Sequence, residues 1–539
     1  MELFTKLFGS LVVLIYHCFD RIVINGYLSM LGRPEQVVYF FKEVLGIEPI
    51  TKEVLGQRTR EYQNWVEAYS RNQGIPLQWA EKKVRKEDYV QPWLKRMQRR
   101  QQQGVYFIFK SMEQGPTFRS STPKYPTADP HYRILSKQRS RFTHYYFYIL
   151  DELLGPMVMR VASFIPFQTT YYLNGHSYMS QELDKLGIRF NKSDNAFLSV
   201  ADPKVLQKVA DSLSPPLIRN RLEYWTLILG PKFSKRERRA MNLKRFYAIS
   251  QIEYCRNFIF RRNHIIHKIF ERSCELGLWN LTSDKISQVF GCRLTKRLQG
   301  KLATTLEKVD HGHHILRSYF KNAFVKQYEK FSTFLRQEVC SNNLSDFRLK
   351  KGLDSLPAIR DQFLSALDRF AHLQAQSFNV PIDFPLFQRL SLPVVLGRSK
   401  IPGIKIQDTR ILRLMEILLH AGTQMSGWRS TELYTAILKT FKIPTSQYTL
   451  TQLRYDLYKM KAHGLLERET NRYCYRLSKK GIRTSLMFVL FHKHVCGPLA
   501  HSIFNNRTIP LKKTNSKLLK TFQKADNYVH EIIQILNAA

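Results

Sequence analysis

An excess of positive charge is the sequence feature that most constrains this chain. Lys and Arg together number 84 against 43 Asp and Glu, which gives a formal net charge of +41 over 539 residues. A folded state must therefore form against strong self-repulsion, which a polyanionic partner would relieve. Nucleic acid is the commonest polyanion that proteins bind, and we expect it here. A solubility device and a membrane-surface protein are the alternatives that composition leaves open.

The composition otherwise indicates folded domains. Hydrophobic residues make up 44% of the chain and aromatic residues 13%, too much for a disordered basic tail. A chain of this length normally divides into several domains. We predict an α+β, multidomain fold with these regions: a mixed α/β region over 1–120, a strand-rich α+β domain over 131–214, a long helical domain over 215–378, a helix-and-hairpin module over 404–495 and a basic helical tail over 496–539.

The cysteines and the N-terminus indicate an intracellular, cytoplasmic protein with no membrane partner. The seven cysteines are odd in number and widely spaced, and none forms a CxxC pair, as expected of reduced thiols. The apolar run over 7–19 is too short to span a bilayer. Asp20 and Arg21 interrupt it, so we predict two buried strands, over 11–16 and 21–28.

Local patterns predict the remaining elements. Toward the N-terminus we expect helices over 34–44 and 58–71, a strand over 105–109 and a loop over 111–130. Next come a hairpin of strands 144–150 and 157–164, a strand over 167–173, and helices over 177–186 and 203–213. The helical domain is expected to contain helices over 242–276, 315–339 and 354–376.

Residues 409–490 carry the best-defined pattern. Three helices are predicted over 409–420, 430–439 and 449–463, and Gly464 ends the third. Leu453, Leu457 and Met460 share one face of that helix, and two short strands over 465–468 and 473–477 form a hairpin after it. This order, and the stretch LRYDLYKMKAHGLLER…RYCYRLSKKG over 453–481, resembles the winged helix-turn-helix family.

The resemblance implies that the third helix enters the major groove and that the hairpin, or wing, touches the DNA backbone. On that mapping the outward residues of the helix are Thr451, Gln452, Arg454, Tyr455, Lys459 and Lys461, and the wing contributes Arg468 and Arg472. The alternative is a module that packs only against protein. The surplus of Lys and Arg in this stretch favours nucleic acid.

Further basic clusters precede this module and suggest a wider contact surface. The residues that we predict to bind nucleic acid there are Lys82, Lys83, Arg99, Arg100, Lys235, Arg236, Arg238, Arg239, Arg261 and Arg262. Each cluster alone is usually a solvated face. Together, with Tyr89 and Trp93 interleaved in the first, they fit phosphates and unpaired bases of DNA or of structured RNA.

No standard catalytic signature is present: the sequence has no P-loop, no HExxH and no GxSxG motif. The histidine-rich stretches over 310–314 and 492–501 lack zinc-ligand spacing, so we predict no metal site and no cofactor. A nuclease would need carboxylates that converge on Mg²⁺. The few candidates are Asp20, Asp151 and Asp194, whose alternative role is in turns or caps.

A weaker resemblance concerns KQYEKFSTFLRQE over 326–338, which is similar to a stretch of some plasmid and phage replication initiators. It would imply DNA nicking by Tyr328, although Glu329 replaces the Asp of that pattern and no paired-histidine motif flanks it. The sequence thus predicts a nucleic-acid-binding protein, DNA-binding or part of a ribonucleoprotein. The alternative is a nucleic-acid-processing enzyme of a mobile element, a metal-dependent nuclease or a replication initiator. A scaffold for acidic partners ranks last.

Overall fold

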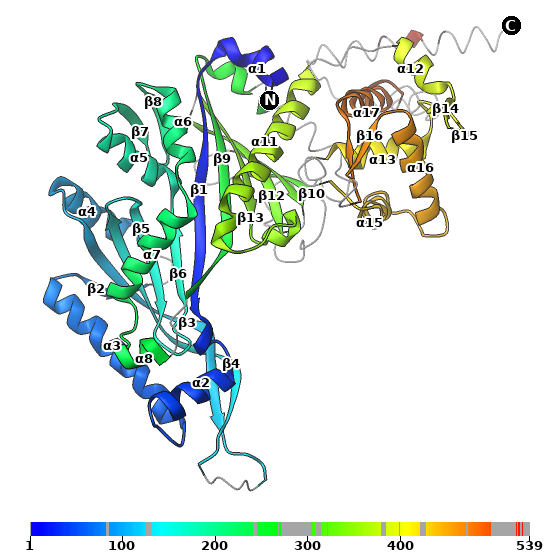
Figure 1. Cartoon of the computed structure of the whole chain (residues 1–539). Coiled ribbons are helices and arrows are strands. Elements are labelled where there is room, and N and C mark those ends of the chain that lie inside the picture. The colour runs from blue at the N-terminus through cyan, green and yellow to red at the C-terminus, as the bar shows by residue number, and fades with distance from the viewer. Residues whose placement is uncertain are drawn as a thin grey trace.

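The computed structural model of the chain is shown in Figure 1. It describes residues 2–81, 86–125, 131–240, 245–267, 269–270, 303–308, 314–320, 322–331, 333–378, 384–397, 399–420, 427–469 and 473–496, and positions 524, 527, 528 and 531. Several predictions fall outside these residues, namely those for Lys82, Lys83, Arg472, the histidines at 311 and 313, and most of the tail over 496–539.

Within the described residues, eleven strands form one twisted sheet in the order β10-β11-β12-β13-β9-β1-β6-β5-β4-β3-β2. Neighbouring strands are antiparallel except β2 and β3, which are parallel. The strands are β1 (Val12–Leu28), β2 (Leu77–Trp79), β3 (Gly104–Ser121), β4 (Ile134–Asp151), β5 (Gly155–Ala162), β6 (Thr169–Leu173), β9 (Arg245–Phe260), β10 (Ala303–Lys308), β11 (His314–Phe320), β12 (Ala323–Phe331) and β13 (Phe334–Ser341).

The sheet has two halves with the same strand order. In the first, β1 is followed by the strands β3 to β6, and β6 returns to pair with β1. In the second, β9 is followed by β10 to β13, and β13 returns to pair with β9. The long strands β1 and β9 join the halves, with Cys18 directly opposite Cys255. Residues near that pair therefore come together from both halves of the chain.

Both faces of the central strands are covered. The helix α11 (Leu356–Phe378) packs against β9 and β13, while α5 (Gly175–Lys185) and α6 (Pro203–Asp211) pack against β1. Consecutive side chains of a strand point to opposite faces. Gln337 contacts Gln374 of α11, whereas its neighbour Arg336 contacts the backbone of Asn195, so the two coverings lie on opposite faces of β13.

The predicted α+β class is confirmed, but the helical domain over 215–378 is not. Residues 245–260 form β9 instead of part of a helix over 242–276, and the stretch expected as a helix over 315–339 forms β11, β12 and β13. β13 is buried on both faces and so does not alternate between apolar and polar residues. β11 and β12 alternate in burial, but their inward positions include the polar residues Ser318 and Gln327, which hides the strand period in the sequence. The domain boundaries predicted near 120 and 214 also fall within the range of this one sheet.

Other predicted elements are confirmed with shifted ends. The helices over 34–44 and 58–71 correspond to α2 (Pro34–Tyr39) with the turn Phe40–Val44, and to α3 (Lys52–Gln73). The β4–β5 hairpin, β6, α5, α6 and α11 are also present. The loop predicted over 111–130 is instead partly strand, because β3 continues to Ser121.

The C-terminal module has the predicted order of elements. It comprises α13 (Thr409–Leu419), α15 (Ser430–Phe441), α16 (Leu450–Ala462), β16 (Leu466–Glu469), β17 (Cys474–Leu477) and α17 (Lys479–Phe491). An isolated bridge joins Trp428 to Tyr475, which adds a third short strand segment to the hairpin. Trp428 also packs on Phe320 of β11 at 5.8 Å between ring centroids, so this module adjoins the sheet (Figure 1).

A buried histidine on β4 gives the fold a measurable pH dependence. Burial, with the nearby charge of Arg160, lowers the pKa of His144 to about 4. In the unfolded chain a histidine titrates near 6.5, so between about pH 6.5 and 4 only the unfolded chain takes up this proton. The free energy of unfolding should therefore fall by about 3 kcal/mol as the pH falls through that window.

The His144→Gln variant tests this origin. Urea unfolding of both proteins at pH 7 and at pH 4 should show a loss that is smaller in the variant by about 3 kcal/mol, because glutamine does not titrate. Equal losses in the two proteins would show that His144 does not cause the dependence.

Candidate functional site

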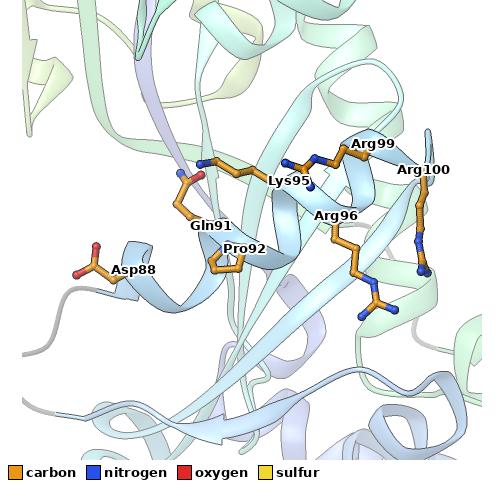
Figure 2. Close-up of a pocket in the computed structure, with 7 residues that line it drawn as sticks. All are labelled: Asp88, Gln91, Pro92, Lys95, Arg96, Arg99 and Arg100. Carbon is orange, nitrogen blue, oxygen red and sulfur yellow. The ribbon is translucent and has the colours of Figure 1, made fainter.

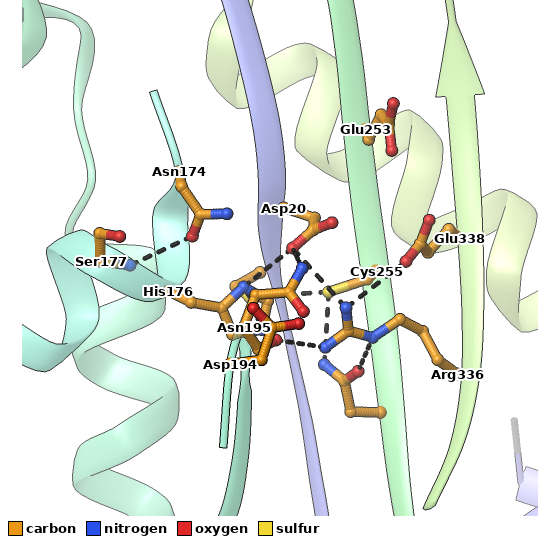
Figure 3. Close-up of polar contacts among 12 residues, drawn as sticks. Asp20, Asn174, His176, Ser177, Asp194, Asn195, Glu253, Cys255, Arg336 and Glu338 are labelled. Atoms are coloured by element: carbon orange, nitrogen blue, oxygen red, sulfur yellow. Dashed lines mark hydrogen bonds and ion pairs between the residues drawn. The ribbon is translucent and has the colours of Figure 1, made fainter. Parts of the chain in front are cut away.

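A cluster of buried polar side chains lies where the two halves of the sheet meet (Figure 3). Its first member is Asp20, which sits at an irregularity in β1: Phe19 pairs with Tyr254 and Arg21 with Glu253, so Asp20 is the extra residue of a β-bulge. A bulge redirects a side chain, and bulges are frequent beside active sites. Asp20 thus interrupts one continuous strand, which corrects the prediction of two separate strands.

His176 reaches the cluster from the first turn of α5. The Asn174 side chain caps this helix by accepting a hydrogen bond from the Ser177 amide at 3.2 Å. A Cβ atom at Gly175 would lie 2.1 Å from the Phe19 carbonyl oxygen, so glycine permits the helix to approach β1 this closely. The approach leaves the His176 side chain fully buried against Cys18 and Asp20.

The donors and acceptors around His176 are closely spaced. Its Nδ1 lies 3.1 Å from Asp20 Oδ1, and its Nε2 lies 3.4 Å from Cys18 Sγ. The two thiol sulfurs of Cys18 and Cys255 are 3.7 Å apart. The Asn257 amide donates to Cys255 Sγ at 3.3 Å, and Asn195 donates to Asp20 Oδ1 at 2.7 Å. Imidazole, carboxylate and two thiols therefore form one contiguous group.

Arg336 of β13 lies beside this group and is completely buried. Its Nε donates to Asn257 Oδ1 at 2.7 Å, and its Nη2 donates to the backbone oxygen of Asn195. Its Nη1 lies 3.7 Å from Asp20 Oδ1 and 3.6 Å from Glu338 Oε1. The guanidinium thus lies between the carboxyl groups of Asp20 and Glu338 and compensates the negative charge of both.

The cluster continues to the second half of the sheet through Glu338. The Tyr328 hydroxyl donates to Glu338 Oε1 at 2.7 Å, and the Lys326 ammonium pairs with Glu338 and, at 3.2 Å, with Glu253. Lys326 and Tyr328 alternate along β12, so the strand turns both side chains to one face.

Burial and neighbouring charge act in opposite directions on the acidic groups. Burial would raise the pKa of Asp20, but the His176 hydrogen bond and the charges of His176 and Arg336 hold it well below its usual range. Burial raises the pKa of Glu338, and the charges of Lys326 and Arg336 do not fully offset this. Asp20 is therefore a carboxylate, whereas Glu338 is held closer to its protonated form.

This arrangement is unsuited to the catalytic roles that the sequence suggests. Asp20 and Glu338 are already paired with Arg336 and Lys326, so a Mg²⁺ ion bound by both would have to displace these cations. Burial, then the charge of Glu338, raises the pKa of Tyr328 well above its ordinary value. Its hydroxyl donates to Glu338 Oε1, so Tyr328 is held as a neutral phenol within the cluster.

The other two carboxylate candidates lie apart from the cluster's centre. Asp151 is fully buried at the end of β4 and accepts hydrogen bonds from Arg221 and Trp225 of α7 (Pro215–Leu229). Asp194 occupies the turn between β7 (Phe190–Ser193) and β8 (Ala196–Val200) with a φ of 52°, and its carboxylate accepts from Lys330 at 2.7 Å. Both have the turn and anchoring roles that were the alternative.

A second candidate site is the exposed face of α16. Of the predicted residues, Thr451, Arg454, Tyr455 and Lys461 are exposed, and Tyr458, which the sequence pattern did not single out, is 43% exposed beside them. The one acidic residue of this helix, Asp456, points inward and accepts from Arg410 and the Tyr448 hydroxyl, each at 2.9 Å. The exposed face of α16 is therefore cationic and aromatic.

Two of the predicted outward residues are not free to contact a partner. Lys459 is buried, and its ammonium donates to Asp408, the N-cap residue of α13, at 3.2 Å. The prediction of an outward Lys459 is thus wrong, because the ion pair and the packing of its stem hold it inside. Gln452 is half-buried and forms a capping box with Thr449 at the start of α16.

Arg468 of the β16–β17 hairpin and the described residues of the remaining basic clusters are exposed. Arg468 lies over the ring of Tyr473 at 4.7 Å to the centroid. The C-terminal half of α4 (Lys86–Arg99) lines an open hollow of about 770 Å³ with Lys95, Arg96, Arg99 and Arg100 (Figure 2). Lys235, Arg236, Arg238 and Arg239 project from α8 (Lys235–Ala240), and Arg261 and Arg262 follow β9.

Sequence reasoning missed most of the buried cluster, including Cys18, His176, Cys255, Arg336 and Glu338. The available signal was polar residues inside apolar runs, since His17-Cys18 and Asp20 interrupt β1, and Cys255 to Asn257 interrupt β9. Nothing in the spacing indicated that these interruptions face each other.

Comparison with known proteins adds no assignment: no family model, no curated protein and no solved structure matches this chain. Among the described helices, none combines the length and the apolar character needed to cross a membrane.

Proposed function

We propose that the chain binds nucleic acid through its C-terminal module, which acts as a winged helix with α16 as the recognition helix. The observation that carries the proposal is the exposed face of α16, where Arg454 and Lys461 accompany Tyr455 and Tyr458 while the single carboxylate of the helix is buried. Such a face suits the phosphates and base edges of a major groove.

The order of elements supports this proposal. Three helices precede the hairpin, and the Trp428–Tyr475 bridge extends it, as in winged helices. Contacts with the sheet use Trp428, while α16 lies on the side of the module away from the sheet (Figure 1). The recognition face is thus left accessible.

The basic clusters on α4 and α8 are proposed as additional phosphate contacts. They lie on the first half of the sheet, at the opposite end of the molecule from α16 (Figure 1). One nucleic acid that touched all of them would be long, or bent, or folded like a structured RNA. A cytoplasmic location belongs to the same proposal, and the free thiols of the described cysteines are compatible with it.

Substitution of the exposed cations of α16 is the direct experiment. The R454A/K461A variant should bind duplex DNA or RNA at least about tenfold more weakly than the wild type, because each cation should contribute on the order of 1 kcal/mol or more to binding. The slope of log K against log salt should shrink by about 2, one unit for each phosphate that the variant no longer neutralises. Fluorescence anisotropy of the full-length protein with labelled duplexes and single strands, at several salt concentrations, measures both.

The K400A/K405A variant is the matched control. It removes the same charge at two exposed lysines that immediately precede α13, next to the module. Its affinity should stay within about threefold of the wild type, since exposed charges away from the bound nucleic acid act only through a screened field. Equal weakening in both variants would refute α16 as the binding element, and a flat salt dependence of the wild type would refute nucleic-acid binding itself.

A further inference from the structure

We propose that Cys18, Cys255 and His176 form a zinc site at the junction of the two halves of the sheet, with the Tyr16 hydroxyl as the fourth ligand. The three side chains come from β1, β9 and α5, and all are fully buried or nearly so. The sequence pattern predicted no metal site, because the ligands are separated by 158 and 237 positions and no short-spaced motif marks them.

The distances between donor atoms match the edges of a zinc tetrahedron. With zinc–sulfur and zinc–nitrogen distances of about 2.3 and 2.0 Å, tetrahedral geometry separates two sulfurs by about 3.8 Å and a sulfur from a nitrogen by about 3.5 Å. Cys18 Sγ lies 3.7 Å from Cys255 Sγ and 3.4 Å from His176 Nε2. These two edges thus have the lengths expected in a closed zinc site.

Tyr16 is placed to complete the coordination. Its oxygen lies 3.4 Å from His176 Nε2, and a nitrogen and an oxygen on one zinc tetrahedron are separated by about 3.3 Å. The Phe197 amide donates to the same oxygen at 2.9 Å, a contact that a metal-bound phenolate would retain. Tyr16 and Cys18 alternate along β1 and so point to one face of the sheet.

The surroundings of the three ligands are those expected around a metal. Asp20 lies 3.1 Å from Nδ1 of His176, as the carboxylate does in carboxylate–histidine–zinc arrangements. Cys18 Sγ lies 3.4 Å from Nε2 and 3.8 Å from Nδ1, so the imidazole must rotate for Nε2 to face a metal held by the sulfurs. The Asn257 amide donates to Cys255 Sγ, the kind of hydrogen bond that stabilises a thiolate ligand. With two thiolates and the Tyr16 phenolate the site carries one net negative charge beside Arg336, and zinc binding would release the two thiol protons and the phenol proton to solvent.

The principal rival is a pair of metal-free thiols, or a disulfide between the two facing strands. Neither would account for the histidine and its carboxylate on the same side of the sulfurs. A bound zinc would also link β1, β9 and α5, so its removal should loosen the junction of the two halves. This inference does not depend on the proposed nucleic-acid binding.

Metal content of the purified full-length protein is the first test. Elemental mass spectrometry should find about one zinc per chain in the wild type, at most a tenth of that in Cys18→Ser and Cys255→Ser, and an unchanged content in Cys474→Ser. Cys474 is a buried cysteine of β17 that belongs neither to the three donors nor to the neighbouring group of Glu253, Glu338 and Cys340, which makes it the matched control. Wild-type protein with only trace metal, or with a Cys18–Cys255 disulfide on mass mapping, would overturn the proposal.

Spectroscopy of the wild-type protein tests the zinc site without the use of variants, which could fail to fold. Protein produced with cobalt in place of zinc should show sulfur-to-cobalt charge-transfer absorption and the intense visible bands of a tetrahedral ion. X-ray absorption at the zinc edge should find two sulfur neighbours at about 2.3 Å. A six-coordinate cobalt spectrum, or a zinc edge with only nitrogen and oxygen neighbours, would place the metal elsewhere and refute this site.

Discussion

Replacement of Arg336 by methionine should lower the free energy of unfolding by about 3–5 kcal/mol, because it removes the buried cation that Asp20 and Glu338 share and leaves only His176 and Lys326 to compensate their charges. Arg336 has no exposed surface, and its guanidinium lies within 4 Å of both Asp20 and Glu338. Methionine preserves much of the apolar stem, so the loss reports the charge and its hydrogen bonds more than a cavity. Urea unfolding followed by circular dichroism and tryptophan fluorescence measures it.

Two further variants separate charge from packing. Arg256→Met removes another buried arginine, on β9, but its partner Asp368 is 42% exposed and regains water, so the loss should be distinctly smaller. The D20N/R336M double variant also lacks the charge of Asp20. Its loss in the free energy of unfolding should therefore be smaller than the sum of the losses in the two single variants. Strict additivity, or a loss for Arg336→Met below about 1 kcal/mol, would contradict the role assigned to this guanidinium.

The sequence predicted amphipathic elements well and doubly buried strands poorly. The helices α13, α15 and α16 each have one buried face, so their apolar residues recur with the helical period. Every residue of β13 is buried, including Arg336, Gln337 and Glu338, so this strand shows neither alternation nor an apolar run. Because β13 has charged residues and no strand period, its sequence is similar to that of a solvent-exposed helix.

The buried cluster could not be predicted because pairing, and not local pattern, assembles it. Cys18 and Cys255 meet only through the register of β1 with β9, and His176 joins them through the approach of α5 at Gly175. The sequence did single out Asp20 as an interruption of an apolar run, and it did single out Tyr328. Arg336 contacts Asp20, and Glu338 contacts Tyr328, so these two residues join Asp20 and Tyr328 into one network. No sequence motif marks Arg336 or Glu338.

Within α16 the sequence predicted the buried stripe but not every outward residue. The helical pattern places Lys459 on the exposed face, yet the carboxylate of Asp408 draws its ammonium into the contact between α13 and α16. The helical period gives the direction in which a side chain leaves the helix. It does not give the position of the charged end of a long side chain, which depends on where that charge forms an ion pair. Asp456 has a short side chain and lies on the inward side of α16, where the longer Arg410 side chain reaches it.

Asp151 provides the second large expected effect, as an anchor between the β4–β5 hairpin and α7. One carboxylate oxygen accepts from the amides of Leu153 and Leu154 at 2.9 and 2.8 Å, and the other accepts from Arg221 and, at 2.7 Å, from Trp225. The side chain is completely buried. Asp151→Asn should therefore lower the free energy of unfolding by about 3 kcal/mol, since an amide removes the charge and turns a donor toward donors.

Glu152 supplies the matched control, because it contacts the same arginine from the surface. Its carboxylate lies 2.8 Å from Arg221 Nη1, but its side chain is 47% exposed. Glu152→Gln should cost less than about 1 kcal/mol, as exposed ion pairs do. Urea unfolding of the three proteins compares the two losses, and a value for Asp151→Asn no larger than that for Glu152→Gln would refute the anchoring role. If folded Asp151→Asn retains wild-type affinity for nucleic acid, the carboxylate serves the hairpin and not the proposed binding surface.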